Sequence, residues 1–343
     1  MKAATANRLA TPLRTVTPKG GRDSDPASLK DYARRLLWPV PRHLSRNHIR
    51  LDASGRAWLR ASLEQHYYTD WRAGGRYTQD KYDRELAGQL RVIEQIRRNF
   101  IPWLDHACPL QGRRVVEVGC GTGSSTVALA EQGARVTAID IHDGSLEVAR
   151  DRCRLYGLGA RLIKLSGDSI ASLGENAADL VVFSASLEHM TIEERLAALK
   201  GAWHIVPAGG AVAVLDTPNR LWYFDQHTSQ LPFYNWLPND LAFHYSRFSP
   251  RENFRELYDD YTPDSELHFL RRGRGVSFHE FELAIRPARS LKVISSLSSY
   301  RGRLGRFLGQ RASRKYKSML MQLCPGIHEG FFDPSLELVI ARD

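Results

Sequence analysis

Cysteines and long apolar runs are both scarce in this sequence. The 343 residues include four cysteines, without a CxxC spacing or a cysteine–histidine cluster, at Cys108, Cys120, Cys153 and Cys324. This scarcity argues against a disulfide framework and a zinc site, and it predicts a reducing, cytoplasmic location. No apolar run is long enough for a membrane-spanning helix. With 43% hydrophobic residues, the chain is still long enough for one substantial core and an added subdomain.

Acidic residues are scarce in two segments. Residues 1–60 contain thirteen Lys or Arg against four Asp or Glu, and residues 301–317 contain seven Lys or Arg and no acid. Such segments are either solvated surface or contacts for an anionic acceptor or an anionic membrane, the latter through Leu304, Phe307 and Leu308. Peripheral membrane contact is therefore an alternative to a purely cytoplasmic location. Nucleic acid is disfavoured, because few aromatic residues interleave with the basic ones.

The first 22 residues contain no acid, which resembles a transit peptide in composition, but they lack the apolar core of a secretory signal. Their prolines and glycines equally favour a disordered tail over residues 1–27.

A glycine-rich segment, VVEVGCGTGSST at 115–126, is the most informative feature. It predicts a buried strand that breaks into a tight turn and then a helix, with bare backbone N–H groups on which a nucleotide-like cofactor can lie. Its glycines alternate at Gly119, Gly121 and Gly123, whereas in the dinucleotide-binding pattern the last glycine lies three residues beyond the second.

Two further strands are predicted to end in carboxylates. Residues 135–139 lead to Asp140, which is placed to accept hydrogen bonds from both hydroxyls of a ribose. Residues 161–165 are followed by Asp168, which is placed to accept from an exocyclic adenine amine. Each acid also has a structural alternative: Asp140 as a helix N-cap, and Glu117 as a group that orients the turn.

These features resemble the class I S-adenosylmethionine-dependent methyltransferases across roughly residues 112–218. The first motif of that family is matched by residues 117–123, the second by Asp140 and the third by Asp168. DLVVFSASLEHM at 179–190 matches its fourth strand and the following loop. The triplet Leu187-Glu188-His189 resembles the corresponding segment of the quinone-pathway O-methyltransferase branch of this family, the methyltransferase type 11 group.

The resemblance implies S-adenosylmethionine as cofactor and S-adenosylhomocysteine as product. It implies that the first two glycines line the methionine part, that Asp140 holds the ribose and that Asp168 with Ser169 borders the adenine. Cys120 has no base nearby in sequence, so we interpret it as a small side chain packed under the cofactor. The predicted cofactor-binding residues are Glu117, Gly119, Cys120, Gly121, Gly123, Asp140, Ile141, Asp168, Ser169 and Ser184.

Strands and helices are predicted to alternate from residue 112 onward, which gives an α/β protein with a parallel, doubly wound sheet. The resemblance implies a Rossmann-like seven-stranded sheet. The predicted strands are 114–118, 135–139, 161–165, 179–184, 210–216, 291–299 and 335–341. The predicted helices are 28–37, 56–70, 79–101, 123–132, 144–156, 192–205 and 278–286. The predicted parts are a basic tail (1–27), an N-terminal helical or lid region (28–110), a cofactor-binding core (111–218), an aromatic-rich cap (219–275) and a C-terminal completion of the core (276–343) with the basic insertion 301–317.

The cap, residues 219–275, begins at the carboxyl end of a predicted strand and is rich in aromatic residues. Such rings either stack on a sugar or aryl acceptor and exclude water, or form the cap's own core. The rings predicted to contact substrate are Trp222, Tyr223, Phe233 and Trp236.

Methyl transfer to a hydroxyl benefits from a general base, and a neutral histidine suits that role. His189, after the fourth strand, and His227, at the start of the cap, are both candidates, with Asp225 or Glu188 orienting the ring. No set of clustered acids or histidines suggests a metal ion.

The sequence therefore predicts an O-methyltransferase of a hydroxylated small molecule or a glycan-type acceptor. The alternatives are N- or carboxyl-methylation, in which a histidine base matters less, and a non-catalytic cofactor-binding protein that docks on a membrane or a polyanion. The acceptor and the oligomeric state do not follow from the sequence.

Overall fold

The structure is a computed structural model that describes residues 49–69, 79–251, 254, 261–301 and 311–343, with no side chains described at 81, 82, 85, 311 and 312. The predicted tail 1–27, the predicted helix 28–37 and most of the two basic segments lie outside the described residues. No helix among the described ranges is long and apolar enough to cross a membrane.

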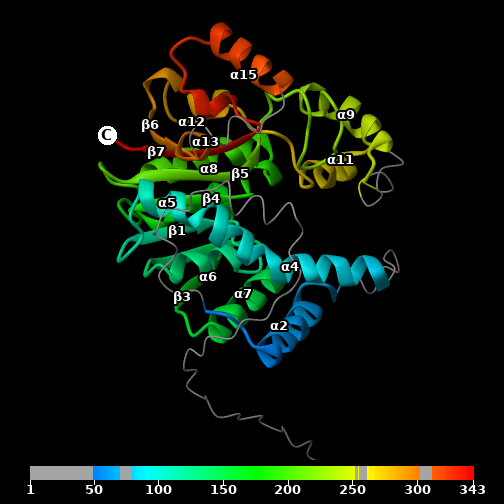
Figure 1. Ribbon diagram of the computed structural model, residues 1–343, viewed down its shortest axis with the longest axis vertical. Coiled ribbons are helices and arrows are strands. Elements are labelled where there is room, and N and C mark those ends of the chain that lie inside the picture. The colour runs from blue at the N-terminus through cyan, green and yellow to red at the C-terminus, as the bar shows by residue number, and fades with distance from the viewer. Residues whose placement is uncertain (1–48, 70–78, 252–253, 255–260, 302–310) are drawn as a thin grey trace, which may run out of the picture. The chain divides into compact units, whose positions relative to one another are not determined.

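A seven-stranded sheet forms the centre of the described fold, in the order β3-β2-β1-β4-β5-β7-β6 (Figure 1). Strands β1 to β5 run parallel to one another, and β7 runs antiparallel to both β5 and β6. The strands are β1 (Arg114–Val118), β2 (Arg135–Asp140), β3 (Ala160–Lys164), β4 (Leu180–Ser184), β5 (Ala211–Pro218), β6 (Lys292–Ser296) and β7 (Ser335–Ala341). This confirms the predicted Rossmann-like α/β fold.

Helices cover both faces of the sheet. The α-helices are α2 (Ala53–His66), α4 (Gln79–Asn99), α5 (Ile101–Ala107), α6 (Ser124–Ala130), α7 (Asp143–Leu155), α8 (Ile192–Ile205), α9 (Asn239–Tyr245), α11 (Pro263–Leu270), α12 (Phe278–Ala284), α13 (Leu297–Tyr300) and α15 (Arg311–Leu323). The 3₁₀ turns are η1 (Gly167–Leu173), η2 (Leu187–His189), η3 (Tyr234–Trp236), η4 (Ser246–Phe248), η5 (Ala288–Ser290) and η6 (Glu329–Phe332).

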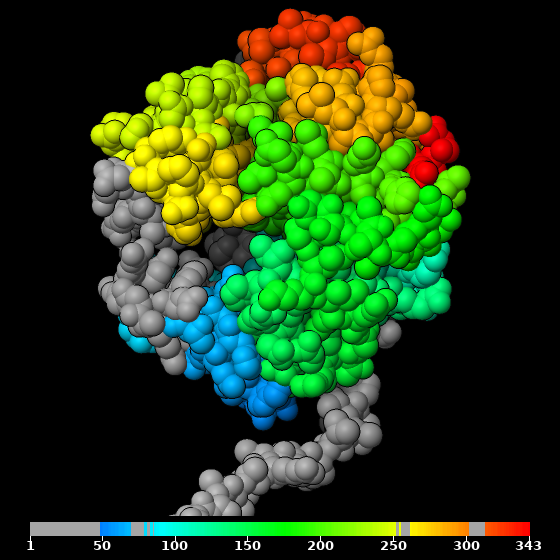
Figure 2. Space-filling model, turned by 180° about the vertical axis from the view of Figure 1, so that it is seen from behind, coloured from blue at the N-terminus to red at the C-terminus, as the bar shows by residue number. Residues whose placement is uncertain are grey.

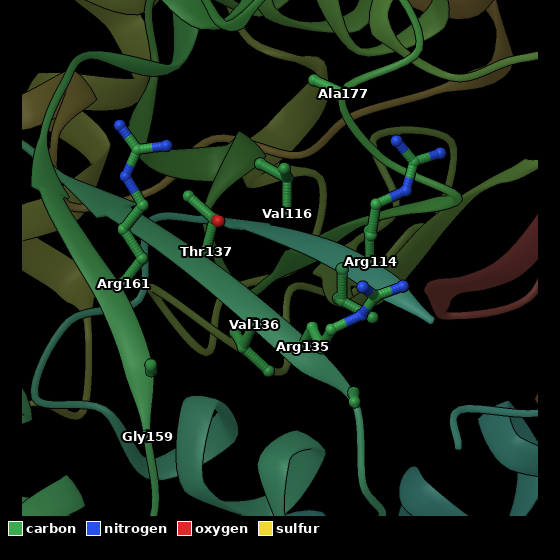
Figure 3. Close-up of a pocket in the computed structure, with 11 residues that line it drawn as sticks. Arg114, Val116, Arg135, Val136, Thr137, Gly159, Arg161 and Ala177 are labelled. Carbon is green, nitrogen blue, oxygen red and sulfur yellow. The ribbon is translucent and has the colours of Figure 1, made fainter. Parts of the chain in front are cut away.

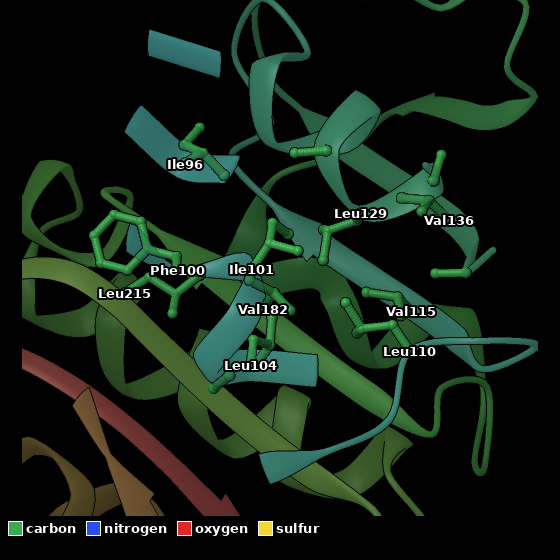
Figure 4. Packing of buried hydrophobic residues seen from close by; sticks show 14 of the residues in the cluster. Ile96, Phe100, Ile101, Leu104, Leu110, Val115, Leu129, Val136, Val182 and Leu215 are labelled. Atoms are coloured by element: carbon green, nitrogen blue, oxygen red, sulfur yellow. The ribbon is translucent and has the colours of Figure 1, made fainter. Parts of the chain in front are cut away.

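Each face of the sheet has its own apolar core because strand side chains alternate between faces. Side chains of α4, α5, α6 and α7 pack on one face, and those of α8, α12 and η6 pack on the other. Figure 4 shows the first core, in which Phe100, Ile101 and Leu104 lie against Val182 and Leu215. Burial of this apolar surface holds the strand ends, and therefore the site, in fixed positions.

Most predicted elements from residue 79 onward lie within one or two residues of the observed ones. Some of these elements end two or three residues earlier than predicted. The predicted helix 79–101 ends at Asn99, and α5 begins with Pro102 in its first turn, where proline is tolerated. The predicted strand 291–299 ends at Ser296, whose side chain caps α13. The predicted helix 278–286 ends at Ala284.

The N-terminal helices pack on the helices that follow the first two strands. Ser62 Oγ of α2 donates to Asp151 Oδ2 of α7 at 2.7 Å. A fully buried ion pair between Arg97 of α4 and Glu131 after α6 ties α4 to the core. These contacts bring α2 and α4 close to the glycine turn.

The cap has a small core of its own, formed by Leu231, Tyr234, Ala242, Phe243, Phe254 and Phe269. Two arginines attach the cap to the loop after β4. Arg195 of α8 donates to the carbonyl oxygens of Leu187 and Gly275, at 2.8 Å and 3.2 Å. Arg271 donates to both carboxylate oxygens of Glu194. The cap is thereby held over the carboxyl ends of β4 and β5.

Candidate active site

The glycine turn after β1 adopts the backbone angles that only glycine takes without strain. Gly119, Gly121 and Gly123 have φ angles of 73°, 50° and 81°. A Cβ on Gly119 would lie 2.7 Å from the Cβ of Ser186, so the loop after β4 packs directly on the turn. Apart from its chain neighbours, a Cβ on Gly121 would meet no heavy atom of the described residues within 4 Å. Open space at Gly121 is where a ligand can lie against the backbone.

Asp140 joins the end of β2 to the glycine turn. Its Oδ2 accepts from the N–H of Gly121 at 2.8 Å, and its Oδ1 accepts from the N–H of His142 at 2.9 Å. Each carboxylate oxygen has lone pairs left for further donors. Asp140 therefore orients the turn, and it remains able to accept from a ribose. It is not the N-cap of α7, because the side chain of His142 occupies that role.

Glu117 is fully buried beneath the turn. Its Oε2 accepts from Thr126 Oγ1 at 2.6 Å, and its Oε1 has no hydrogen-bond partner among the described residues. Burial raises the pKa of Glu117 to about 7. The nearby Ser186 Oγ is also buried without a partner. These two orphaned atoms, one acceptor and one hydroxyl, fit a ligand that carries an ammonium or another hydrogen-bonding group, such as the amino acid part of the predicted cofactor.

The other predicted cofactor residues line the same strand ends. Asp168 and Ser169 are exposed at the start of η1, and Ile141 is exposed directly after Asp140. Ser184 is half-buried at the end of β4. Cys120 is buried, and burial raises the pKa of its thiol above the usual range, so it stays protonated and is not a nucleophile.

Two histidines converge on one buried carboxylate after β4. The Nε2 atoms of His189 and His227 lie 3.8 Å and 3.6 Å from Oε1 of Glu188. Glu188 is fully buried, and no described residue forms a hydrogen bond with its Oε1. The histidine side chains are 42% and 33% exposed, so both rings remain reachable from solvent. We call these three residues the His–Glu–His cluster.

The cap fixes the tautomer of His189. Its Nδ1 lies 2.8 Å from the carbonyl oxygen of Arg271, and because a carbonyl only accepts, Nδ1 carries the hydrogen. The neutral ring therefore keeps the lone pair on Nε2, the atom that faces Glu188. Partial withdrawal from water lowers the pKa of His189, and Arg272 and Arg195 lower it further. Neutral His189 is thus the favoured form at physiological pH.

Asp216 was not predicted from the sequence but belongs to this region. It lies near the end of β5 with a φ of 53°, which is uncommon for a residue other than glycine. Burial raises its pKa, and the positive form of His227 opposes that shift. The left-handed backbone angle distinguishes Asp216 in the structure, but no sequence pattern predicts that this residue belongs to the site.

Asp225 contacts the main chain rather than a histidine ring. Its carboxylate accepts from the N–H groups of His227, Thr228 and Ser229, at 3.1 Å, 3.1 Å and 2.6 Å. Asp225 therefore shapes the loop that carries His227. The carboxylate beside the ring of His227 is Glu188.

The four predicted substrate residues fall into two groups. Trp222 is buried and Tyr223 half-buried, and both rings pack against Tyr316 of α15, with centroids 5.3 Å and 5.1 Å away. Phe233 and Trp236 are each 49% exposed, and their ring centroids lie 4.9 Å apart. The second pair is therefore exposed, whereas the first supports the start of the cap.

The surface is hollowed between the cap, the core and α2. Figure 2 shows this hollow, bordered by the yellow segment that contains α11, by the green core and by the blue α2. Two of these borders, α2 and the α11 segment, contact residues that follow strands. Tyr67, next to α2, contacts the ring of His142 after β2, and Arg271, next to α11, contacts His189 after β4. Carboxyl ends of strands, where ligands bind in folds of this kind, therefore lie near two borders of the hollow.

A second hollow, of about 590 Å³, lies at the opposite, amino ends of β1, β2 and β3. Figure 3 shows Arg161 on one side of it and Arg114 and Arg135 on the other, so the guanidinium groups do not converge. Arg114 is already ion-paired with Asp179. This hollow has no acid or base suited to group transfer, and we do not assign it to the active site.

The raised pKa of Glu188 predicts that the stability of the fold depends on pH. Burial raises the pKa of Glu188 from its ordinary value of 4.5 to about 7. As the pH rises, Glu188 therefore ionises in the unfolded chain before it ionises in the folded protein. Stability is therefore lost as the pH rises from 4.5 through 7. We expect Glu188→Gln to be more stable than the wild type at pH 8 by about 1–3 kcal/mol, and equal to it near pH 4.5, in urea unfolding.

The matched control is Glu175→Gln, because the side chain of Glu175 is 73% exposed and also lies 3.8 Å from a histidine, His204. In this control, the difference in unfolding free energy between pH 8 and pH 4.5 should equal that of the wild type. A Glu188→Gln variant that is less stable than the wild type at pH 8 would contradict the burial argument.

Comparison with known proteins supports the assignment of the core. Residues 115–210 match a family described as a methyltransferase domain. A ubiquinone biosynthesis O-methyltransferase of Albidiferax ferrireducens is 31% identical over 141 residues, which make up 40% of this chain and 53% of that protein. One of Paracidovorax citrulli is 33% identical over 141 residues, or 40% of this chain and 56% of that protein. The chain thus spans little more than half the length of these curated relatives.

Among solved structures, magnesium protoporphyrin IX methyltransferase from Synechocystis PCC 6803 with bound S-adenosylmethionine is 22% identical, with a TM-score of 0.35. The likeness covers 51% of this chain and 80% of that one. Residues 115–210 thus match a methyltransferase domain, and the sheet around them has the Rossmann-like α/β topology.

Proposed function

We propose that this protein transfers a methyl group from S-adenosylmethionine to a hydroxyl oxygen of a small molecule or a glycan-type acceptor. The observation that carries the proposal is the convergence of His189 and His227 on buried Glu188. Their loop packs on the glycine turn through Ser186. A potential base is therefore next to the proposed cofactor site.

The residues of the turn fit the cofactor. Gly121 would leave room for its methionine part, Glu117 would accept from its ammonium and Asp140 would hold its ribose. When bound, the cofactor supplies a sulfonium methyl group as the electrophile. The protein has to align the acceptor oxygen with that methyl and to exclude water.

The cluster would supply the proton acceptor. A neutral histidine Nε2 takes the hydroxyl proton as the oxygen attacks, and the ring becomes positively charged. Ionised Glu188 beside the ring stabilises that charge. Asp225 contributes by holding the loop of His227, and Arg271 by fixing the tautomer of His189. No metal ion is needed for this step.

The cap would select the acceptor. The exposed pair Phe233 and Trp236 offers two aromatic faces on which a sugar or an aryl ring can stack. The curated relatives are described as O-methyltransferases of ubiquinone biosynthesis, which adds support for oxygen and makes phenols the first acceptors to test.

The test is methyl transfer from methyl-labelled S-adenosylmethionine to a panel of phenols, sugars, amines and carboxylic acids. The proposal expects label on hydroxylated compounds only. Label on amines or carboxylic acids would favour the alternative acceptor classes instead. Cofactor binding without any transfer to the panel would favour the non-catalytic alternative.

We also propose contact with an anionic membrane through the outer face of α15. Arg314, Lys315, Met319 and Leu323 are exposed on this helix, a combination typical of helices that lie at a lipid surface. We expect the protein to sediment with phosphatidylglycerol vesicles at low salt. Charge reversal of Arg314 and Lys315 to Glu should weaken this binding, as should high salt. Equal binding to neutral phosphatidylcholine vesicles would contradict the proposal.

A further inference from the structure

Arg152 of α7 is a buried cation without an acidic partner. Its side chain is fully buried, and no carboxylate of the described residues forms an ion pair with it. Its Nη1 atom has no hydrogen-bond partner in the part of the chain that the structure describes. Burial lowers its pKa to about 10. A guanidinium in this state costs stability, because buried charges normally require a paired charge.

The hydrogen bonds that Arg152 does make go to one residue of the glycine turn. Its Nε donates to the carbonyl oxygen of Thr122 at 2.8 Å, and its Nη2 donates to Thr122 Oγ1 at 3.2 Å. The hydroxyl of Thr122 in turn donates to Gln89 Oε1 of α4 at 3.0 Å. Thr122 thus joins the turn to α7 and to α4.

These bonds fix the peptide group between Thr122 and Gly123 at both ends. Its carbonyl oxygen accepts from Arg152, and its N–H donates to the carbonyl oxygen of Cys120 at 3.0 Å. Directly beneath, a Cβ on Gly123 would lie 2.9 Å from the Cα of Ala149, so α7 supports the turn without a gap. A turn held in this way presents its N–H groups in one arrangement before a ligand arrives.

We propose that Arg152 is a positioning residue for the cofactor, one that acts by holding the Thr122 peptide of the glycine turn in its binding conformation. The inference rests on the proposed function, because it assumes that the turn binds S-adenosylmethionine. An apolar side chain of similar length at this position would fill the space without the cost of a buried charge. A charged donor at this position is favoured over an apolar side chain only if the conformation of the turn depends on its hydrogen bonds to Thr122.

The test measures the affinity for S-adenosylhomocysteine in the full-length protein by calorimetry. We expect Arg152→Met to bind roughly 10–100-fold more weakly, because it loses two hydrogen bonds from a charged donor. Arg152→Lys retains a charged donor and should recover part of the affinity. Thr122→Val removes only the side-chain bonds and should show a smaller loss. In methyl transfer, KM for the cofactor should rise while kcat at saturation stays within about twofold.

The control is Ser62→Ala, which breaks the bond to Asp151 on the same helix without touching the turn. It should leave the cofactor affinity unchanged. If Arg152→Met does not fold, the lysine and valine variants decide the question.

Wild-type affinity in the folded Arg152 variants would overturn this inference and leave the proposed function intact. A wild type that binds no S-adenosylhomocysteine would overturn the proposed function, and this inference with it.

Discussion

Replacing Gly121 with alanine is expected to remove most cofactor binding while leaving the protein folded. Apart from its chain neighbours, the new Cβ meets no atom of the described residues within 4 Å, so it adds no clash with that part of the fold. Its positive φ of 50° costs about 1–2 kcal/mol of stability for a residue with a Cβ. The added methyl group would occupy the space proposed for the methionine part of the cofactor. We expect the affinity for S-adenosylhomocysteine to fall by about 100-fold or more, measured by calorimetry.

Gly112→Ala is a matched control, because Gly112 also has a positive φ, of 75°, and free space around its Cβ position. It lies before β1, at the end of the sheet opposite the glycine turn. Both variants should lose similar stability, and only Gly121→Ala should lose affinity. Equal cofactor affinity in the two variants would show that the ligand does not lie against Gly121.

Removing both histidines of the His–Glu–His cluster is expected to lower kcat by roughly 10²–10⁴-fold for a hydroxyl acceptor. The double variant His189→Gln/His227→Gln lacks both imidazole rings that are proposed to accept the proton. Cofactor affinity should stay close to the wild-type value, because neither ring belongs to the glycine turn. In the wild type, the rate should rise with pH as His189 becomes neutral, and this rise should disappear in the double variant. Single-turnover rates from pH 5 to pH 9 measure both effects.

His204→Gln is the control for the histidine variants. His204 also lies 3.8 Å from a glutamate, but it is 47% exposed near the end of α8. It should keep the wild-type rate and the wild-type pH profile. A double cluster variant that retains full activity would mean that the acceptor needs no base, which is the behaviour expected of an amine or a carboxylate.

The glycine turn and the strands around it could be predicted from the sequence because their signals are local. Alternating glycines mark positions of positive φ, and apolar runs of about five residues mark buried strands. The acid that follows each strand then lies at the same edge of the sheet by topology alone. Asp140 therefore lies next to the turn, as its place after β2 predicts.

The arrangement of the His–Glu–His cluster could not be predicted in the same way. Glu188 and His227 are 39 positions apart, and the cap loop that brings them together has no regular pattern. Both Glu188 and Asp225 are plausible partners for His227 by sequence. Only the fold shows that Asp225 is occupied with three main-chain N–H groups, whereas Glu188 faces the ring.

The aromatic residues of the cap show the same limit. Their number predicts either a binding surface or a small core, and both occur. Tyr234 and Phe243 are buried in the core of the cap, while Phe233 and Trp236 remain exposed. Phe233 is exposed whereas its neighbour Tyr234 is buried, because a left-handed backbone angle at Phe233 turns the chain between them.

The most direct test of the central claim is calorimetric titration of the purified full-length protein with S-adenosylhomocysteine, alongside Asp140→Ala. We predict binding to the wild type with a Kd on the order of 1–100 μM, and no measurable binding to a folded Asp140→Ala variant. Absence of binding to the folded wild type would contradict the assignment of the glycine turn as a cofactor site.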